Sequence, residues 1–146
     1  MRKEKSKIKL LVFGILLLLA STPAKEDVTF KLECQKLLSK EFEVTLPIPF
    51  RLQKENSEGG IIYFYSFPDL SYIIICQNTA AYFPPDEYEP EKESIVNQRK
   101  ISVGQQDDKF WRKDVLDDVR VYYDNVTSEN KEMYNCILNN LKIVPL

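Results

Sequence analysis

The alternation of apolar and polar residues predicts several strands along this chain. Residues 41–46 alternate three polar with three apolar side chains, which is the spacing of a half-buried strand. Pro47 and Pro49 then interrupt the hydrogen-bond ladder, since proline donates no backbone hydrogen bond. Residues 50–53 can resume as an edge strand. The pattern therefore fits either two strands joined by a kink or one strand with a bulge.

Two hairpins are predicted further along the chain. Runs of β-branched and aromatic residues over 61–67 and 72–76 follow a glycine turn and predict an antiparallel hairpin in the middle of a sheet. Because both runs are apolar throughout, both faces of that sheet must be covered. Residues 109–115 and 119–123 alternate on either side of the turn at 116–118 and predict the second hairpin.

Helical spacing of apolar residues indicates a helix at each end of the domain. Over 27–38, Phe30, Cys34 and Leu37 recur at helical intervals behind an Asp27 cap, although Val28 and Thr29 also fit a strand. At the other end, Thr127 or Ser128 caps an amphipathic stripe formed by Met133, Tyr134, Ile137, Leu138 and Leu141. We therefore expect an α+β fold: an antiparallel sheet of about five to six strands packed against a C-terminal helix and an N-terminal helix.

The first 24 residues predict an export signal. Five basic residues lead into an apolar block from Leu10 to Ala20, and small residues follow it. The block is about half the length that a helix needs to cross a bilayer, so cleavage after Thr22 or Ala24 is expected in preference to an uncleaved membrane anchor. Residues 25–146 then form a single domain that is secreted or periplasmic.

Charge excludes one class of partner. Removal of residues 1–24 leaves 15 basic against 21 acidic residues, a net charge of about −6. Nucleic-acid binding needs clustered Lys and Arg, so it is not expected. We also expect no membrane contact after signal cleavage, and a monomer. Three prolines and several acids over about 80–98 predict an extended acidic loop of the kind that carries function or is disordered.

The sequence offers little catalytic chemistry. It contains no histidine, which removes histidine-based nucleophile systems and metal sites, and its four glycines form no phosphate-binding loop. We expect no enzyme activity, no cofactor and no metal. The weakest alternative is a carboxylate glycosidase using Asp114, Asp117 and Asp118 on the second hairpin, because paired carboxylates can cleave glycosidic bonds without histidine.

Three cysteines, Cys34, Cys76 and Cys136, stand in a chain expected to enter an oxidising compartment. At most one internal disulfide can form. The cysteines are expected to be small buried hydrophobes, with a Cys76–Cys136 disulfide between a strand and the last helix as the leading alternative.

Two segments resemble the PsbP/Mog1-like α+β domains. These are Val44-Thr45-Leu46-Pro47, within the segment 42–50, and Asn139-Asn140-Leu141-Lys142-Ile143 after the closing helix. The resemblance covers about a third of the mature chain. Members of that group are mostly non-enzymatic binding or assembly proteins, so the resemblance implies binding rather than catalysis, and it transfers no functional residue.

Aromatic residues among the acids of the long loop indicate a contact surface for a protein. A proline-stiffened loop costs little entropy to order, and aromatic anchors carry much of the energy of protein interfaces. The alternative places Tyr82, Phe83 and the lone tryptophan in the core. The expected contact residues are Tyr82, Phe83, Asp86, Glu87, Tyr88, Glu89 and Trp111.

We accordingly expect an exported binding protein that engages a protein partner, as an inhibitor or an immunity-like protein. The runner-up is a small-ligand carrier with a pocket between sheet and helix.

Overall fold

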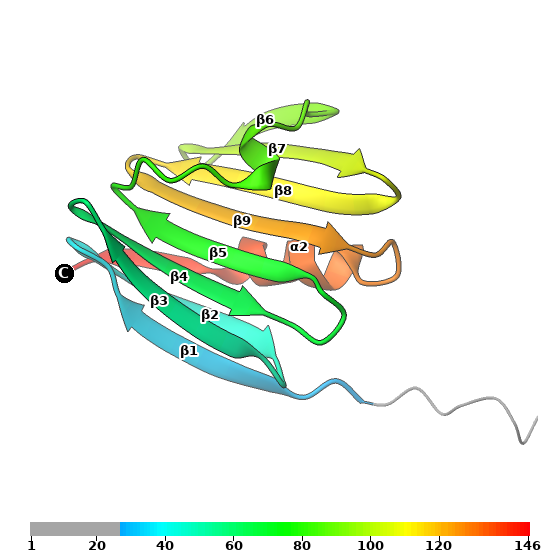
Figure 1. Ribbon diagram of the computed structural model, residues 1–146, viewed down its shortest axis with the longest axis horizontal. Coiled ribbons are helices and arrows are strands. Elements are labelled where there is room, and N and C mark those ends of the chain that lie inside the picture. The colour runs from blue at the N-terminus through cyan, green and yellow to red at the C-terminus, as the bar shows by residue number, and fades with distance from the viewer. Residues whose placement is uncertain (1–26) are drawn as a thin grey trace, which may run out of the picture.

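The computed structural model describes residues 27–146, which form ten strands in two antiparallel sheets and one α-helix (Figure 1). The predicted export signal lies outside the described residues. Within 27–146, no helix is long and apolar enough to span a bilayer.

The small sheet has the order β1-β2-β10, with β1 Phe30–Lys36, β2 Lys40–Pro47 and β10 Lys142–Pro145. The large sheet has the order β3-β4-β5-β9-β8-β7-β6, with β3 Arg51–Ser57, β4 Gly60–Ser66, β5 Tyr72–Gln77, β6 Lys92–Val96, β7 Arg99–Gln106, β8 Lys109–Leu116 and β9 Val119–Val126.

The predicted α+β class is wrong, because the chain is mostly β and has two sheets rather than one. The expected N-terminal helix over 27–38 is strand β1, which pairs with β2 along its whole length. Two periods coexist in this segment: the apolar residues fit helical spacing, but Phe30, Leu32 and Cys34 also alternate with polar residues. Tertiary pairing with β2 decides between the two periods.

The two predicted hairpins and the C-terminal helix are confirmed. Strands β4 and β5 form the central hairpin and are buried on both faces, and β8 and β9 form the second hairpin, with an irregularity between Phe110 and Arg112. The C-terminal helix is α2, Lys131–Asn140, and it buries Tyr134, Ile137 and Leu138. Its N-cap is Asn130, not Thr127 or Ser128. Pro47 is the last residue of β2 and pairs with Phe30 of β1, and Pro49 lies in the connection between the two sheets.

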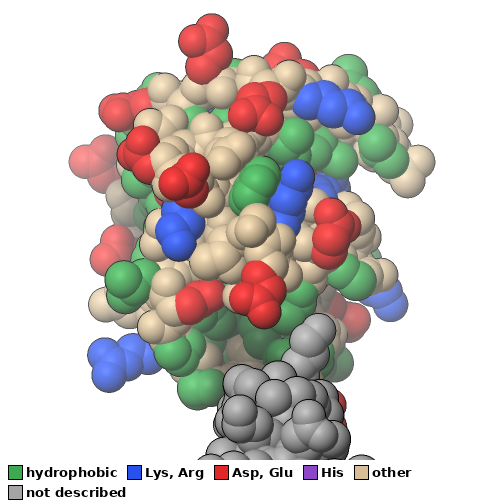
Figure 2. Space-filling view, turned by 90° about the vertical axis from the view of Figure 1, so that its right-hand side faces the viewer, with side chains coloured by type: hydrophobic (Ala, Val, Ile, Leu, Met, Phe, Trp, Pro, Cys, Tyr) green, Lys and Arg blue, Asp and Glu red, His purple; other side chains and the backbone are tan. Residues whose placement is uncertain are grey.

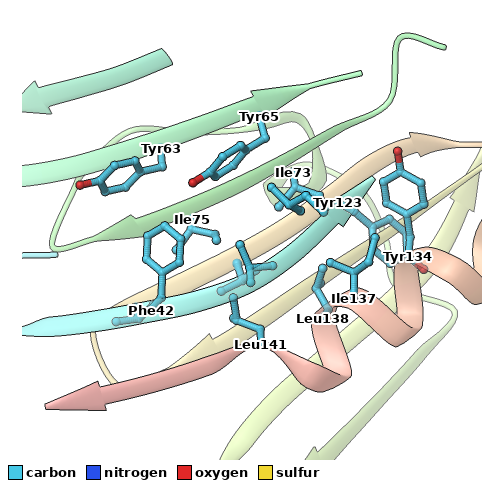
Figure 3. Packing of buried hydrophobic residues seen from close by; sticks show 14 of the residues in the cluster. Phe42, Tyr63, Tyr65, Ile73, Ile75, Tyr123, Tyr134, Ile137, Leu138 and Leu141 are labelled. Atoms are coloured by element: carbon cyan, nitrogen blue, oxygen red, sulfur yellow. The ribbon is translucent and has the colours of Figure 1, made fainter. Parts of the chain in front are cut away.

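The main core lies between the large sheet and a second layer formed by the small sheet and α2. Figure 3 shows Phe42 of β2 and Leu138 of α2 directed toward Ile73 and Ile75 of the large sheet. Tyr63, Tyr65, Tyr123 and Tyr134 fill the remaining space as a group of buried aromatic rings. The alternative hypothesis expects a ligand pocket between the sheet and the helix. The side chains of Tyr134, Ile137 and Leu138 fill the space between α2 and the large sheet.

A buried ionic cluster fastens α2 to the far half of the large sheet. The Asp114 carboxylate, 2% exposed, accepts two hydrogen bonds from Arg112, of 2.7 and 2.9 Å, and a third from Arg99 of 3.3 Å. Arg99 also donates to the carbonyl oxygen of Leu138 at 2.9 Å, near the helix C-terminus. Its positive charge there is favourable for the helix dipole. One carboxylate thus orients both arginines against the helix.

We predict that Asp114→Ala lowers the free energy of unfolding by about 3 to 5 kcal/mol, because it leaves two guanidinium groups without their counter-ion in a buried place. The matched control is Asp117→Asn, because Asp117 forms an exposed pair with Lys40 that should contribute less than about 1 kcal/mol, and Asn tolerates the φ of 52° at this turn position. Urea unfolding followed by circular dichroism measures both. Equal losses in the two variants would contradict the assigned role of the cluster.

Candidate functional site

Residues 79–91, here called the arm, cross the outer face of the large sheet, opposite the second layer. Figure 1 shows the arm with the short helix η1, Pro84–Asp86, in front of the sheet and α2 behind it. The arm covers a second, smaller apolar cluster: Ile62, Ile74, Cys76 and Tyr122, against which Ala81 and Phe83 pack. The expected loop over 80–98 is therefore an ordered cover here, and its last third forms strand β6.

Asp86 fastens the arm to the sheet. Its side chain is 3% exposed and lies 2.7 Å from the Lys113 ammonium and 3.5 Å from the Arg120 guanidinium. It also accepts hydrogen bonds from the Tyr122 hydroxyl at 2.9 Å and from the Phe83 backbone N–H at 2.8 Å. Burial by itself would raise the pKa of Asp86, but the contacts with Lys113, Phe83 and Tyr122 outweigh it and hold the pKa below its ordinary value. Asp86 is thus a structural anchor inside the molecule.

Arg120 holds the start of the arm, although the sequence analysis did not single it out. It donates to the carbonyl oxygens of Thr79 at 2.7 Å and Ala81 at 3.0 Å, and its guanidinium lies 5.8 Å from the centre of the Phe83 ring. The only sequence signal was its place on the mixed face of β9, where an arginine usually faces solvent.

Trp111 supports the far end of the arm and is not an exposed anchor. It is 2% exposed, and the Tyr88 ring lies against it at 5.7 Å. Gly104 on the neighbouring strand β7 makes room for the indole, because a Cβ atom there would come within 2.7 Å of the ring. The alternative interpretation of the tryptophan as a core residue is the one that the structure supports. As the lone tryptophan, it also reports on the arm.

The remaining predicted contact residues face solvent. Tyr82 is 67% exposed, and its hydroxyl donates to the Asp86 carbonyl oxygen at 3.1 Å, which fixes the ring on the arm. Glu87 and Glu89 are exposed as well. The structure therefore divides the seven predicted residues into an internal set, Phe83, Asp86 and Trp111, an outward set, Tyr82, Glu87 and Glu89, and half-buried Tyr88 between them.

Carboxylates surround Tyr88. Burial, Asp124, Asp107 and Glu87 together raise the pKa of Tyr88. Asp124 is 6% exposed, accepts hydrogen bonds from the Tyr72 and Tyr88 hydroxyls at 2.5 and 3.5 Å, and has no cationic partner within 4.0 Å among residues 27–146. Figure 2 shows acidic side chains prevailing over basic ones at the end of the molecule that lies to the right in Figure 1.

A hollow of about 490 Å³ lies beside the second cluster, at the ends of β3, β4 and β5. The rings of Phe64 and Tyr72 stack at 5.2 Å in its wall, and Arg51 and Leu70 also line it. Its volume lies in the range of small-molecule sites.

The carboxylates considered for glycoside hydrolysis do not form an open pair. Asp114 is buried between Arg112 and Arg99, and Asp117 and Asp118 lie at the β8–β9 turn, 3.3 and 3.7 Å from Lys40. Within residues 27–146, no group of three metal-binding side chains is placed to hold an ion.

All three cysteines are free thiols, so the Cys76–Cys136 disulfide that was the leading alternative is absent, and the expectation that all three are buried holds for Cys76 alone. Cys76 belongs to the cluster beneath the arm, whereas Cys136 lies on α2 across the sheet. The reason is strand parity: Ile75 points toward the helix, and its neighbour Cys76 therefore points away. Burial raises the pKa of Cys76 to about 11, which keeps this thiol protonated and unreactive. Of the three cysteines, only Cys76 is buried.

No family model, curated protein or solved structure matches this chain.

We predict that Asp86→Asn lowers the free energy of unfolding by about 2 kcal/mol, because hydrogen bonds to a charged acceptor contribute about 1.5 to 3 kcal/mol. The emission of Trp111 should shift to the red as Tyr88 leaves the indole. The matched control is Glu87→Gln, which alters an exposed carboxylate on the same segment and should change neither property. An unchanged emission spectrum in Asp86→Asn would contradict the anchoring of the arm.

A pH titration of the same two proteins tests the Asp86 anchor a second time. Since the folded pKa of Asp86 is depressed, its stabilisation is complete above the unfolded value of about 3.9 and is lost as pH falls through the folded pKa. Wild-type Trp111 emission should shift in that acidic window, and Asp86→Asn should show the shifted emission already at pH 7.

Proposed function

We propose that this is an exported binding protein, secreted or periplasmic, that uses the outer surface of the arm to bind a basic protein surface. An inhibitor or immunity-like role, in which it masks a cationic protein, fits this surface best. The observation that carries the proposal is the 67% exposure of Tyr82 on a segment that is already fastened from within.

Fixing the arm in the free protein lowers the free-energy cost of binding a partner. Ordering a loop and its side chains upon association costs free energy, and a segment held in place beforehand avoids most of that cost. Asp86 and Arg120 hold the arm in the free protein, so Tyr82 is presented as a rigid aromatic anchor. Large aromatic side chains of this kind are enriched among the residues that dominate protein interfaces.

The charges around the anchor define the partner's chemistry. Glu87 and Glu89 are exposed on the arm, and Asp107 is exposed near Tyr88. A surface of this sign attracts lysines and arginines over distances of about a Debye length, roughly 8 Å at physiological ionic strength, and raises the association rate. Association should therefore slow as salt is added.

We predict that the full chain with a C-terminal tag captures one stoichiometric protein from extracts of its host or of cells that it meets, and that Tyr82→Ala weakens this capture by at least tenfold. Neutralising Glu87 and Glu89 together should lower the association rate and its salt dependence, measured by surface plasmon resonance with the captured protein. Glu55→Gln with Glu132→Gln removes the same charge from exposed positions outside the arm and should have little effect.

Equal effects of the two charge pairs would mean that only net charge matters, and an unchanged affinity of Tyr82→Ala would remove the arm from the interface. Capture of no protein at low and moderate salt would contradict the proposed function as a whole.

A second candidate function is the binding of a small ligand, and the hollow beside Phe64 and Tyr72 favours it. Stacked aromatic rings next to Arg51 suit a planar molecule with an anionic group. Ligand binding to the folded state raises the melting temperature. Benzoate and indole-acetate are suitable probes: they should stabilise the wild type, and Arg51→Gln should lose this stabilisation. No shift with either probe would count against this candidate.

A further inference from the structure

Strand β1 differs from the other edges of the two sheets. Exposed edges invite pairing with another chain, and proteins protect them with short strands, proline or charged side chains. Strand β10 has four residues and ends in Pro145, β6 has five residues, and β3 carries polar or charged side chains at all positions but one. Strand β1 is seven residues long, lies at the end of the order β1-β2-β10, and borders the molecule in Figure 1.

A strand that packs on a core normally directs its apolar side chains inward and its polar side chains outward, and β1 does the reverse. Register with β2 places Lys31, Glu33 and Gln35 opposite Leu46, Val44 and Phe42, whose side chains enter the core. The polar residues of β1 thus face inward, where Glu33 is 9% exposed and pairs with Lys31 at 3.4 Å.

The outward face of β1 is apolar in consequence. Phe30 is 45% exposed and Leu32 57%, and Cys34 is exposed beside them. The apolar surface continues onto α2, because Phe30 also lines a groove of about 370 Å³ with Met133 and Cys136. Within residues 27–146 nothing covers this face, which is the arrangement expected of a strand completed by a partner.

We propose that β1 pairs antiparallel with β1 of a second copy about a two-fold axis through Leu32, which joins the two small sheets into one. In an antiparallel pair, directly opposed side chains lie on the same face of the sheet, so a symmetric register must be centred on a residue. Centring on Leu32 opposes Leu32 to its own copy and Phe30 to Cys34 on the outer face.

Charge complementarity selects this register. With the axis at Leu32, Lys31 of each copy opposes Glu33 of the other on the inner face, which gives two cross-strand pairs of opposite charge. An axis at Lys31 or at Glu33 would oppose two like charges, and an axis at Cys34 would place Leu32 against Lys36. The self-complementary pattern argues for a second copy as the occupant, in place of the expected monomer. The arm lies on the large sheet and is not used, so this inference is independent of the proposed function.

The test uses the full chain in reducing buffer and sedimentation velocity over a concentration series. The wild type should form a dimer, and Leu32→Lys should weaken dimerisation at least tenfold, because two cations would then meet at the axis. The control is Val144→Lys, which places the same charge on an exposed apolar position of the other edge strand β10 and should leave dimerisation unchanged. Circular dichroism melts check that each variant is folded.

Cross-linking tests the register. Opposed residues in an antiparallel pair have Cα atoms about 4.5 to 5.5 Å apart, within the span of a disulfide. Leu32→Cys with Cys34→Ser and Cys136→Ser should give a covalent dimer under mild oxidation, whereas Cys136→Ser alone, which keeps Cys34, should not. A monomer at all concentrations would overturn the proposal and leave the edge to another partner, and a dimer cross-linked through Cys34 instead of position 32 would overturn the register.

Discussion

The central strands β4, β5 and β9 carry apolar side chains on both faces, and the rest of the structure follows from the need to cover them. One face is covered by the small sheet and α2, which bury a continuous aromatic and aliphatic core. The other face carries a smaller apolar cluster, and the arm covers it. Both covers depend on a buried carboxylate that meets cationic side chains: Asp114 beneath α2 and Asp86 beneath the arm.

The sequence predicted the features that depend on local pattern. The two hairpins and α2 follow from runs of apolar residues and their period, and the need for two covers follows from the apolar strands. The sequence did not predict the division into two sheets. Residues 30–36 fit both the helical and the strand period, and only the pairing with β2 decides between the two. Strands β6 and β7 were not predicted, for a related reason. Their sequences are rich in charged and polar residues, and they gain their stability from neighbouring strands in the sheet.

The candidate site was predicted in location but not in detail. Proline, acid and aromatic content singled out the arm, and Tyr82 is exposed on it as a contact residue requires. The sequence could not show that Asp86 points inward, because its partners Lys113 and Tyr122 come from the second hairpin, 27 residues and more away. Arg120 was missed for the same reason, because its partners Thr79 and Ala81 lie 41 and 39 residues earlier in the chain. An acidic residue in a loop usually faces solvent, and only the topology shows that Lys113 and Arg120, both half-buried, lie next to Asp86.

The central claim is that the arm is a fixed cover in the free protein and not an open loop. Amide hydrogen exchange tests it most directly, because the Phe83 N–H donates to the Asp86 carboxylate and the Asp86 N–H donates to the Phe83 carbonyl oxygen. Both amides should exchange as slowly as those of the exposed strand β6, well below the rate of an unstructured peptide. Exchange of residues 82–87 at the unstructured rate, in a protein whose central strands remain protected, would contradict it.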